Sequence, residues 1–438
     1  MPLWIRNPLA ILADEAPAGI VVQDGRIVEL VTTVPSIPTD TFDASRHVVL
    51  PGLINTHHHF YQTLTRCHPA ALDRPLFGWL EALYPVWARL TPEALDAAAT
   101  VAMAELLLSG CTTTTDHHYV FPPGLEHAID IEAHAATRLG IRAILTRGSM
   151  DLSQRDGGLP PDSVVQDRDT ILADSERLIA RLHDPAPHAM LQVALAPCSP
   201  FSVTTALMRE TAALAERTGT LLHTHLAETQ DEAAFCRERF GCSPLDYLED
   251  CGWLRPRTWL AHGIHFSDAD ISRLARARVG VTHCPCSNQL LASGACRVCA
   301  LEAAGVSVGL GVDGSASNDG SSLIQEVRAA FLLQRGLNGT AVSHRDALRW
   351  ATSGSADCLG RPELGRIEPG AAADLAFYTL DELRFSGAGD PLAALVLCGA
   401  TRADRVMVAG RWVVENGEIP GLDLPALMQR HARAAAAL

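Results

Sequence analysis

The chain has 438 residues, of which 47% are hydrophobic and 19% charged, a balance typical of a folded protein with a large core. All 35 basic residues are arginine, and this absence of lysine excludes a Schiff-base or pyridoxal-phosphate lysine, a P-loop lysine, a lysine base and a carboxylated lysine that bridges two metals. A net charge of −15 without a clustered basic stripe argues against nucleic acid and anionic membranes, so we expect a small-molecule partner.

The first fifty residues carry the pattern of short strands separated by turns. Strands are expected over 19–23 and 26–31, joined by the turn Asp24-Gly25. A third strand over 47–50 leads into Pro51-Gly52. No helical pattern interrupts this part of the chain.

The middle of the chain alternates strand patterns with helical patterns. Eight apolar, β-rich runs predict strands over 48–55, 112–116, 142–147, 191–196, 221–225, 259–263, 280–283 and 306–312. Helical patterns between them cover 92–109, 170–183, 205–218, 269–277 and 323–334. Because right-handed crossovers place successive parallel strands side by side, we predict an α/β fold with a (β/α)8 barrel over residues 51–367.

The C-terminal part returns to short strands, over 373–378, 405–408 and 411–414. Turn signals separate them at Gly370, Ala409-Gly410 and Asn416-Gly417. The two strand-rich flanks predict one small β-sandwich built from residues 1–50 and 368–422. Residues 423–438 are expected to form an Ala-rich helix.

The expected location is the cytoplasm. Asp14 and Glu15 interrupt the N-terminus, so no secretory signal is recognised, and no apolar run reaches the roughly 18 residues of a membrane helix. Twelve cysteines are too few for a disulfide scaffold of this length. The sequence leaves open whether the protein forms a homo-oligomer.

Potential metal ligands occupy the ends of several predicted strands, where barrel enzymes place their chemistry. His57 and His59 follow the first strand, and they point to the same side because strand side chains alternate; His58 faces away. His225 ends the fifth strand and Asp313 the eighth. One such histidine alone is more often a core residue, but three histidines with one aspartate form a set that binds a borderline divalent cation and leaves a water position open.

Four motifs give the sequence a family resemblance. They are Pro-Gly-Leu-Ile-Asn-Thr-His-His-His at 51–59, His-Leu-Ala-Glu at 225–228, Ala-His-Gly at 261–263 and Gly-Val-Asp-Gly-Ser-Ala-Ser-Asn at 311–318. The chain resembles the amidohydrolase superfamily over nearly its whole length, in the single-metal aminohydrolase branch. Within that branch, residues 55–66, 196–201 and 290–318 are most similar to the 8-oxoguanine deaminases.

The resemblance implies one Zn²⁺ per chain, held by His57, His59, His225 and Asp313. It also implies hydrolytic deamination of an amino-bearing, purine-like heterocycle, with 8-oxoguanine converted to urate and ammonia. Guanine, isoxanthopterin and hydroxytriazine aminohydrolases are similar relatives and supply alternative substrates. The missing lysine supports a single metal, because the two-metal members bridge their metals with a carboxylated lysine.

Three residues are expected to carry the proton and charge movements of such a reaction. Zinc lowers the pKa of a bound water to about 7. Glu228, three residues after His225, can take a proton from that water and pass it to the ring nitrogen beside the amino-bearing carbon. His262 can stabilise the developing oxygen, and Asp313 can share the remaining hydroxyl proton.

Three further residues are predicted to contact the substrate. Gln62 follows His59 by three residues, and the resemblance implies that its amide pairs with a ring N–H and carbonyl. Trp79, in the long segment after the first strand, offers a stacking surface or else packs in the core. Arg147, at the end of the third strand, reads an oxo group or else forms a structural ion pair.

Several features keep alternatives open. One of His117, His118 and His283 is expected to orient a metal ligand. The sequence has two cysteine pairs, Cys284 with Cys286 and Cys296 with Cys299. Either they are small buried apolar side chains without a function, or the four together could resemble a structural zinc site. A cyclic amidase would use the same barrel, although the absence of lysine argues against it. A metal-carrying barrel without activity would not need Glu228 and His262.

Overall fold

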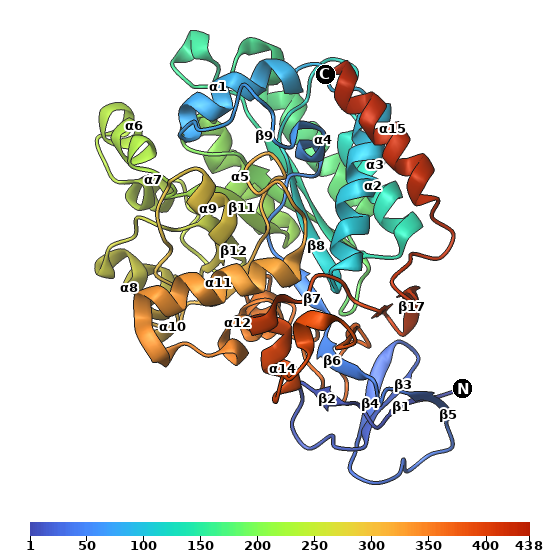
Figure 1. The fold of residues 1–438 in the computed structure, drawn as a ribbon. Coiled ribbons are helices and arrows are strands. Elements are labelled where there is room, and N and C mark those ends of the chain that lie inside the picture. Colours follow the sequence, from blue (N-terminus) through green and yellow to red (C-terminus); the bar gives the residue numbers. More distant parts are fainter.

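The computed structural model describes residues 1–438, and at its centre eight parallel strands close into a barrel (Figure 1). The strands pair in the order β10-β11-β12-β13-β14-β7-β8-β9. Their bounds are β7 (Leu53–Asn55), β8 (Cys111–His118), β9 (Arg142–Ser149), β10 (Leu191–Pro197), β11 (Leu221–Leu226), β12 (Thr258–His262), β13 (Gly280–His283) and β14 (Val308–Leu310). The predicted (β/α)8 fold class is confirmed.

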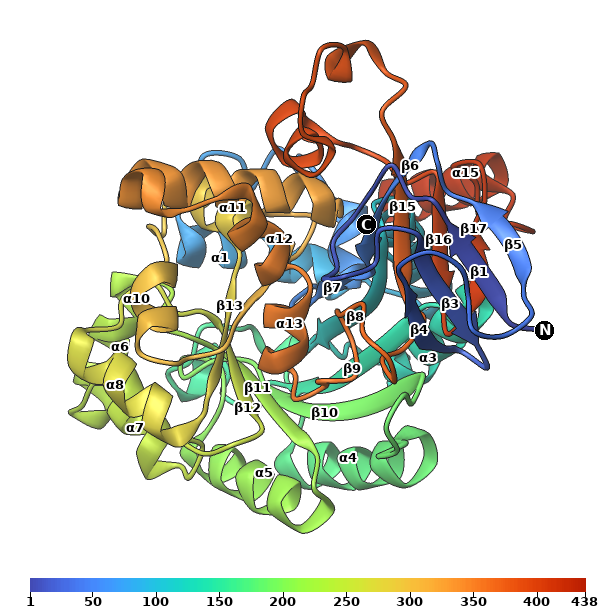
Figure 2. The ribbon, with the colours of Figure 1, turned by 90° about the horizontal axis from the view of Figure 1, so that it is seen from below.

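Helices follow the barrel strands and cover them on the outside, as Figure 2 shows from below. The main ones are α2 (Pro92–Leu108), α3 (Ala128–Leu139), α4 (Arg168–Leu182), α5 (Thr205–Thr218), α6 (Gln230–Phe240), α7 (Pro244–Asp250), α8 (Asp268–Ala277), α10 (Val298–Ala303), α11 (Leu323–Asn338), α12 (His344–Trp350) and α13 (Ser353–Cys358). The helix α2 is capped by Thr91, whose side chain accepts a hydrogen bond from the Ala94 amide.

Two smaller sheets lie beside the barrel. One has the order β4-β3-β1-β5 and the other β17-β16-β15-β6-β2, which joins strands from both ends of the chain. Their strands are β1 (Leu3–Arg6), β2 (Ala10–Ile11), β3 (Gly19–Gln23), β4 (Arg26–Val31), β5 (Asp40–Asp43), β6 (His47–Pro51), β15 (Leu375–Thr379), β16 (Arg405–Val408) and β17 (Arg411–Val414). A cluster of 13 buried apolar residues draws on both sheets. The proposed division into 1–50 with 368–422, 51–367 and 423–438 stays a prediction.

Three turns in these sheets follow directly from sequence. Both central residues of Asp24-Gly25, Ala409-Gly410 and Asn416-Gly417 have positive φ, between 47° and 78°. Tight hairpins need this left-handed pair because it matches the twist of the flanking strands. Asp, Asn and Gly tolerate that conformation better than most residues do.

The predicted strand over 48–55 is two strands in the structure. β6 belongs to a terminal sheet and β7 to the barrel, and the chain changes sheet at Gly52. A Cβ atom at this position would lie 2.1 Å from the Thr112 hydroxyl oxygen, so only glycine allows the close approach. The run looks continuous in sequence because both strands are buried.

A helical insertion separates β7 from α2 and lies over the C-terminal mouth of the barrel. It consists of η1 (Phe60–Thr65) and α1 (Leu76–Trp87), and the short helix α9 (Pro285–Leu290) lies at the end of β13. The remaining helices are η2 (Gln154–Asp156), η3 (Asp162–Val164), η4 (Gly339–Ala341), η5 (Leu383–Phe385), α14 (Pro391–Ala394), η6 (Leu395–Gly399) and α15 (Leu424–Ala437). None of the helices is both long and apolar enough to span a membrane.

Candidate active site

The structure brings the predicted catalytic side chains together at the C-terminal mouth of the barrel. His57 and His59 directly follow β7, His225 lies in β11, His262 ends β12 and Asp313 follows β14. None of the five is more than 9% exposed. His262 and Asp313 have left-handed φ values of 73° and 63°, a strained conformation that is common where function requires a particular side-chain direction.

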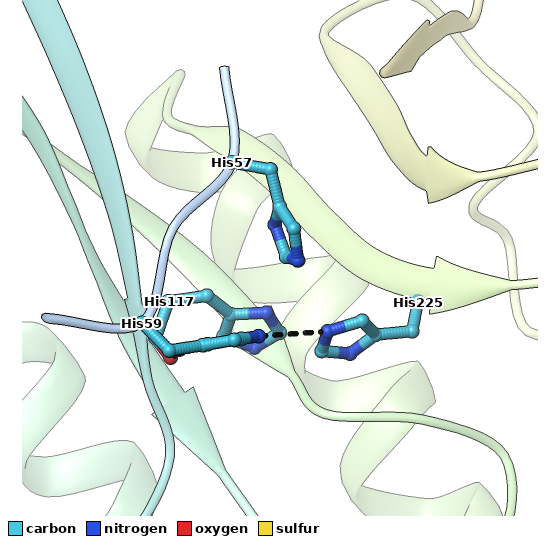
Figure 3. Close-up of side chains that lie close together, drawn as sticks. All are labelled: His57, His59, His117 and His225. Atoms are coloured by element: carbon cyan, nitrogen blue, oxygen red, sulfur yellow. Dashed lines mark hydrogen bonds between the residues drawn. The ribbon is translucent and has the colours of Figure 1, made fainter. Parts of the chain in front are cut away.

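Three imidazoles and one carboxylate converge on a single point; Figure 3 shows these imidazoles, of His57, His59 and His225, together with that of His117. The Nε2 atoms of His59 and His225 are 3.2 Å apart. Oδ1 of Asp313 lies 3.3 Å from Nε2 of His59 and 3.4 Å from Nε2 of His57. Three segments far apart in sequence therefore direct ring nitrogens and a carboxylate oxygen at one small volume.

The other ring nitrogens are anchored to the main chain. Nδ1 of His59 donates to the His117 carbonyl at 2.7 Å, and Nδ1 of His225 donates to the Cys198 carbonyl at 2.7 Å. A neutral imidazole has one N–H, so in this form both Nε2 atoms are lone-pair acceptors. Burial lowers the pKa of His225 to about 3, which keeps that ring neutral.

His57 is oriented by a second histidine. Nδ1 of His223 faces the Trp259 carbonyl at 2.9 Å and must donate to it, so its Nε2 accepts. That Nε2 lies 2.8 Å from Nδ1 of His57, which therefore carries the N–H. The outcome is a bare, fully buried Nε2 on His57 with no hydrogen-bond partner.

These atoms fit a tetrahedral metal. Zinc lies about 2.0–2.1 Å from nitrogen and oxygen ligands, so the edges of its coordination tetrahedron are about 3.3 Å long. The observed separations of 3.2, 3.3 and 3.4 Å match that length. Without a cation, bare nitrogens would face one another and a carboxylate at this distance with no proton between them. Nitrogen and carboxylate ligands together are typical of zinc sites.

The acidic ligand candidate is itself held in place. Oδ2 of Asp313 accepts from the Ser287 hydroxyl at 2.6 Å, and Oδ1 accepts from the Gly314 amide at 2.7 Å. These two donated hydrogen bonds stabilise the charged form of the carboxyl group against the cost of its burial. Asp313 is therefore a carboxylate in this setting.

Glu228 and His262 lie beside the convergence point. Nε2 of His262 is 3.5 Å from Oε2 of Glu228. Asn288 donates from Nδ2 to Nδ1 of His262 at 2.9 Å, so Nε2 carries the N–H and faces the site. Burial, together with the nearby carboxylates of Asp313 and Glu232, raises the pKa of Glu228 well above its usual range. Glu228 can thus hold a proton at neutral pH.

A pocket with an empty volume of about 370 Å³ opens onto these groups. The apolar part of its wall consists of Leu76, Trp79, Leu80, Tyr119, Cys198, Phe201 and Leu291. Polar groups occupy the barrel side of the pocket, and no arginine lines it. Apolar walls with a few convergent polar groups are typical of small-molecule sites.

Two of the three predicted substrate residues line this pocket. Gln62 is 1% exposed, yet neither atom of its amide has a hydrogen-bond partner. A Cβ on Gly314 would lie 1.8 Å from Oε1 of Gln62, so glycine makes room for the amide. Trp79 is fixed by a hydrogen bond from Nε1 to the Ala316 carbonyl at 3.0 Å. An unpaired buried amide is costly, which favours a ligand as its partner.

The structure does not bring Arg147 to the pocket. Nε donates to Asp174 at 2.6 Å, Nη2 donates to Gln166 at 2.7 Å, and Nη1 donates to the Gly148 carbonyl. The guanidinium also lies 3.8 Å from the centre of the Phe121 ring. All three nitrogens are thus occupied, as the structural ion-pair interpretation requires, and we leave Arg147 out of the proposed substrate site.

The other histidines considered in the sequence lie in different places relative to the site. His58 faces away from the site, 3.0 Å from the Ser321 hydroxyl. His117 contacts a ligand candidate through its carbonyl and stacks on His225 with ring centres 4.7 Å apart. His118 pairs with a carboxylate behind the site, and His283 lies near Gln334. The groups of potential metal ligands contain none of the four predicted cysteines.

Two residues of the site were given no role from the sequence. His223 lies two residues before His225 on the same strand, so the alternation that paired His57 with His59 could have identified it. Asn288 lies on α9, and its contact with His262 joins elements whose relative position no local pattern predicts.

The orientation of His57 can be tested through metal retention. His223→Phe keeps a ring that can stack on Trp259 but removes the acceptor for Nδ1 of His57. We expect metal affinity to fall about 10–100-fold, measured by competition with a chromogenic chelator. His223→Gln, which restores an acceptor, should recover part of it. Equal affinity in all three proteins would show that His223 has no orienting role.

The barrel and its cluster of three histidines and one aspartate define a metal-dependent hydrolase. Residues 48–413 match the model of the Amidohydrolase family, and the chain belongs to this family. It is 60% identical to an 8-oxoguanine deaminase of Pseudomonas aeruginosa, over 99% of this chain and 98% of that one. It is 40% identical to a hydroxydechloroatrazine ethylaminohydrolase of Pseudomonas sp., over 92% and 88% of the two chains.

Solved structures give the same result. The chain is similar to the atrazine chlorohydrolase TrzN from Arthrobacter aurescens TC1 complexed with zinc, with a TM-score of 0.93 and 32% identity over 99% of this chain and 100% of that one. It is also similar to an adenosine deaminase from Xanthomonas campestris with bound zinc, with a TM-score of 0.88 and 28% identity over 99% and 97%.

Proposed function

We propose that this protein is a zinc-dependent deaminase of a free purine-like base and that it converts 8-oxoguanine to urate and ammonia. The observation that carries the proposal is the convergence of bare imidazole nitrogens and one carboxylate beside Glu228 and an unpaired Gln62. The choice of 8-oxoguanine rests on the 60% identity to the deaminase of Pseudomonas aeruginosa.

His57, His59, His225 and Asp313 would hold the metal, one per chain. When bound there, a divalent metal lowers the pKa of a coordinated water and so supplies a nucleophile at neutral pH. A single metal is supported by the absence of lysine, because no residue of this chain can form a carboxylated bridge.

Three side chains carry out the proton transfers of the proposed reaction. Glu228 takes a proton from the attacking water and passes it to the ring nitrogen beside the amino-bearing carbon. His262 donates its Nε2–H to the oxygen that develops at that carbon. Asp313 accepts the remaining hydroxyl proton and passes it to the departing amino group as the carbon–nitrogen bond breaks. Ammonia leaves, and a carbonyl takes its place.

The rest of the pocket suits a flat, uncharged base. The Gln62 amide can pair with an adjacent ring N–H and carbonyl, because it is one donor and one acceptor side by side. Trp79 and Phe201 supply apolar surface against which a ring can pack. The absence of any arginine in the lining disfavours a phosphorylated substrate.

Ammonia release from a panel of heterocycles tests the proposal. We expect 8-oxoguanine to show the largest kcat/KM, with guanine, isoxanthopterin and hydroxyatrazine lower. A site that hydrogen-bonds a substrate group can reject an analogue without it by up to about 10⁴–10⁵-fold. A larger value for guanine or isoxanthopterin would overturn the substrate, and no ammonia from any of them would favour a triazine or lactam substrate.

The relatives make isoxanthopterin and hydroxytriazines the alternatives to compare. An isoxanthopterin deaminase is 36% identical over 97% of this chain, and the hydroxydechloroatrazine enzyme is 40% identical. Like the proposed substrate, isoxanthopterin is a fused-ring heterocycle with an amino group. A single assay that includes 8-oxoguanine and both of these compounds therefore separates the three possibilities.

Gln62→Leu should affect binding more than chemistry. The substitution keeps the size of the side chain but removes the donor and acceptor that face the pocket. We expect kcat/KM for 8-oxoguanine to fall about 10–100-fold, since unpaired hydrogen bonds to a buried substrate cost about 1–3 kcal/mol. Gln325→Leu, on the exposed side of α11, is the matched control and should leave kcat/KM unchanged. Unchanged kinetics for Gln62→Leu would remove this residue from the substrate site.

A further inference from the structure

A second cluster of ionisable side chains lies behind the proposed metal site. It consists of Asp116 and His118 on β8 and Glu132 on α3, all at 0% exposure. One ligand atom of each lies within 4.8 Å of the others. The proposed deamination does not use any of the three.

The pairing of His118 with Glu132 requires a proton. Nε2 of His118 faces the Val120 carbonyl at 2.8 Å and donates to it. Nδ1 of the neutral ring is then an acceptor, and it lies 3.0 Å from Oε1 of Glu132. A carboxylate there would place two acceptors in contact. Burial lowers the pKa of His118 to about 4 and raises the pKa of both carboxyl groups, that of Glu132 to about 8. Because Nδ1 of His118 accepts, the proton in this contact belongs to Glu132.

Asp116 connects this cluster to residues 57–60, the segment after β7 that carries His57 and His59 and is called the metal-binding arm below. Its Oδ1 accepts from the Phe60 amide at 2.6 Å, and Phe60 directly follows the ligand candidate His59. Two further hydrogen bonds join the same segments: the His117 amide donates to the His58 carbonyl at 2.7 Å, and the His117 carbonyl accepts from Nδ1 of the His59 side chain. Asp116 is therefore the one side chain of β8 that fixes the main chain of the arm.

Two buried carboxylates cannot both be ionised without a cation beside them. The positive charge of Arg147 lowers the pKa of His118, but the guanidinium of Arg147 is paired with Asp174 and does not neutralise the two carboxyl groups. Oδ2 of Asp116 and both oxygens of Glu132 have no conventional hydrogen-bond partner. Either a shared proton or an unidentified cation must therefore balance the pair.

We propose that Asp116 is a positioning residue for the metal-binding arm and that Glu132 is a neutral neighbour that donates a hydrogen bond to His118, rather than a ligand of a second metal. Asp116 holds the Phe60 amide and so sets the direction of His59. Glu132 donates its one proton to Nδ1 of His118 and lies beside Asp116 without adding a buried charge. This inference rests on the metal site proposed above but not on the identity of the substrate.

Paired variants of Glu132 test the neutral partner. Glu132→Gln keeps the shape and a hydrogen-bond donor without an ionisable group, so we expect metal content and chelator resistance within about twofold of the unmodified protein. Glu132→Met removes the donor and should lower metal affinity about 10–100-fold, the usual cost of losing support behind a metal ligand. Loss of a metal equivalent in Glu132→Gln would show instead that the cluster binds a cation, and equal affinities for Gln and Met would overturn the proposal.

Paired variants of Asp116 test the positioning role. Asp116→Leu removes the acceptor for the Phe60 amide and should lower metal affinity about 10–100-fold, whereas Asp116→Asn keeps an acceptor oxygen and should recover most of it. The control is Asp374→Asn, which weakens a buried pair with Arg142 at the opposite end of the barrel. That control should lower the melting temperature without changing metal affinity. Unmodified affinity in Asp116→Leu would contradict the proposal.

These measurements follow metal affinity, so they do not depend on activity. If Asp116→Leu does not fold, the Glu132 pair decides the question. If no heterocycle releases ammonia but the variants rank as expected, the proposed function fails and the positioning role stands. If deamination occurs but the ranking fails, the reverse holds.

Discussion

Glu228→Gln is expected to keep its metal and lose most of its turnover. Glutamine matches the size of Glu228 but cannot carry the proton between water and the ring nitrogen. Removal of a proton-transferring group typically lowers kcat about 10²–10⁴-fold. Because Glu228 is not among the converging ligand candidates, metal content should stay near that of the unmodified protein. Ammonia release and metal analysis on the same sample measure both quantities.

A matched substitution shows whether the effect belongs to the site. Glu238 lies exposed on α6, ten residues further along the chain, and Glu238→Gln should leave kcat unchanged. Near-normal turnover in Glu228→Gln would remove this residue from the mechanism. Loss of metal in the same variant would mean that Glu228 supports the ligands rather than the proton transfer.

Asp313→Asn is expected to lose metal and activity together. The substitution removes the negative charge that faces Nε2 of His57 and of His59 at 3.3–3.4 Å. An amide oxygen is a weaker zinc ligand than a carboxylate, because it carries no net charge. We expect about one metal equivalent per chain in the unmodified protein and a small fraction of that in the variant. Excess zinc should restore part of the turnover.

Metal stoichiometry also tests the single-metal site. Two tightly held equivalents that both survive replacement of the four cysteines, Cys284, Cys286, Cys296 and Cys299, would contradict it. One equivalent lost in Asp313→Asn but kept in Glu228→Gln would separate metal binding from proton transfer. The two substitutions therefore distinguish the two roles assigned to neighbouring carboxylates.

The site could be predicted wherever one strand carries the information. His57 and His59 share a face because strand side chains alternate, and the structure directs both Nε2 atoms at one point. Gln62 follows on the same short segment and lines the same pocket. Glu228 lies three residues after His225, and it too reaches the pocket. These placements depend on local geometry that the sequence encodes directly.

The position of Arg147 could not be predicted in this way. It occupies a strand end like the others, but its side chain is drawn to Asp174 and Gln166 and over the Phe121 ring. Asp174 lies on α4, and no pattern in the sequence says that this helix places a carboxylate next to that strand end. A long, flexible side chain takes the direction of its strongest partner, and that partner comes from a different element.

The strand–helix alternation, the hairpin turns and the strand ends that carry histidine or a carboxylate could all be predicted from the sequence, which also shows that the chain has no lysine. These properties are local, because they follow from side-chain alternation, turn chemistry and residue type. Tertiary structure alone decided the tautomer of His57, set through His223 by the Trp259 carbonyl, and the burial of Asp116 and Glu132 behind the metal-binding arm. The physical reason is that hydrogen-bond direction and desolvation depend on groups brought together from distant parts of the chain, which no local pattern records.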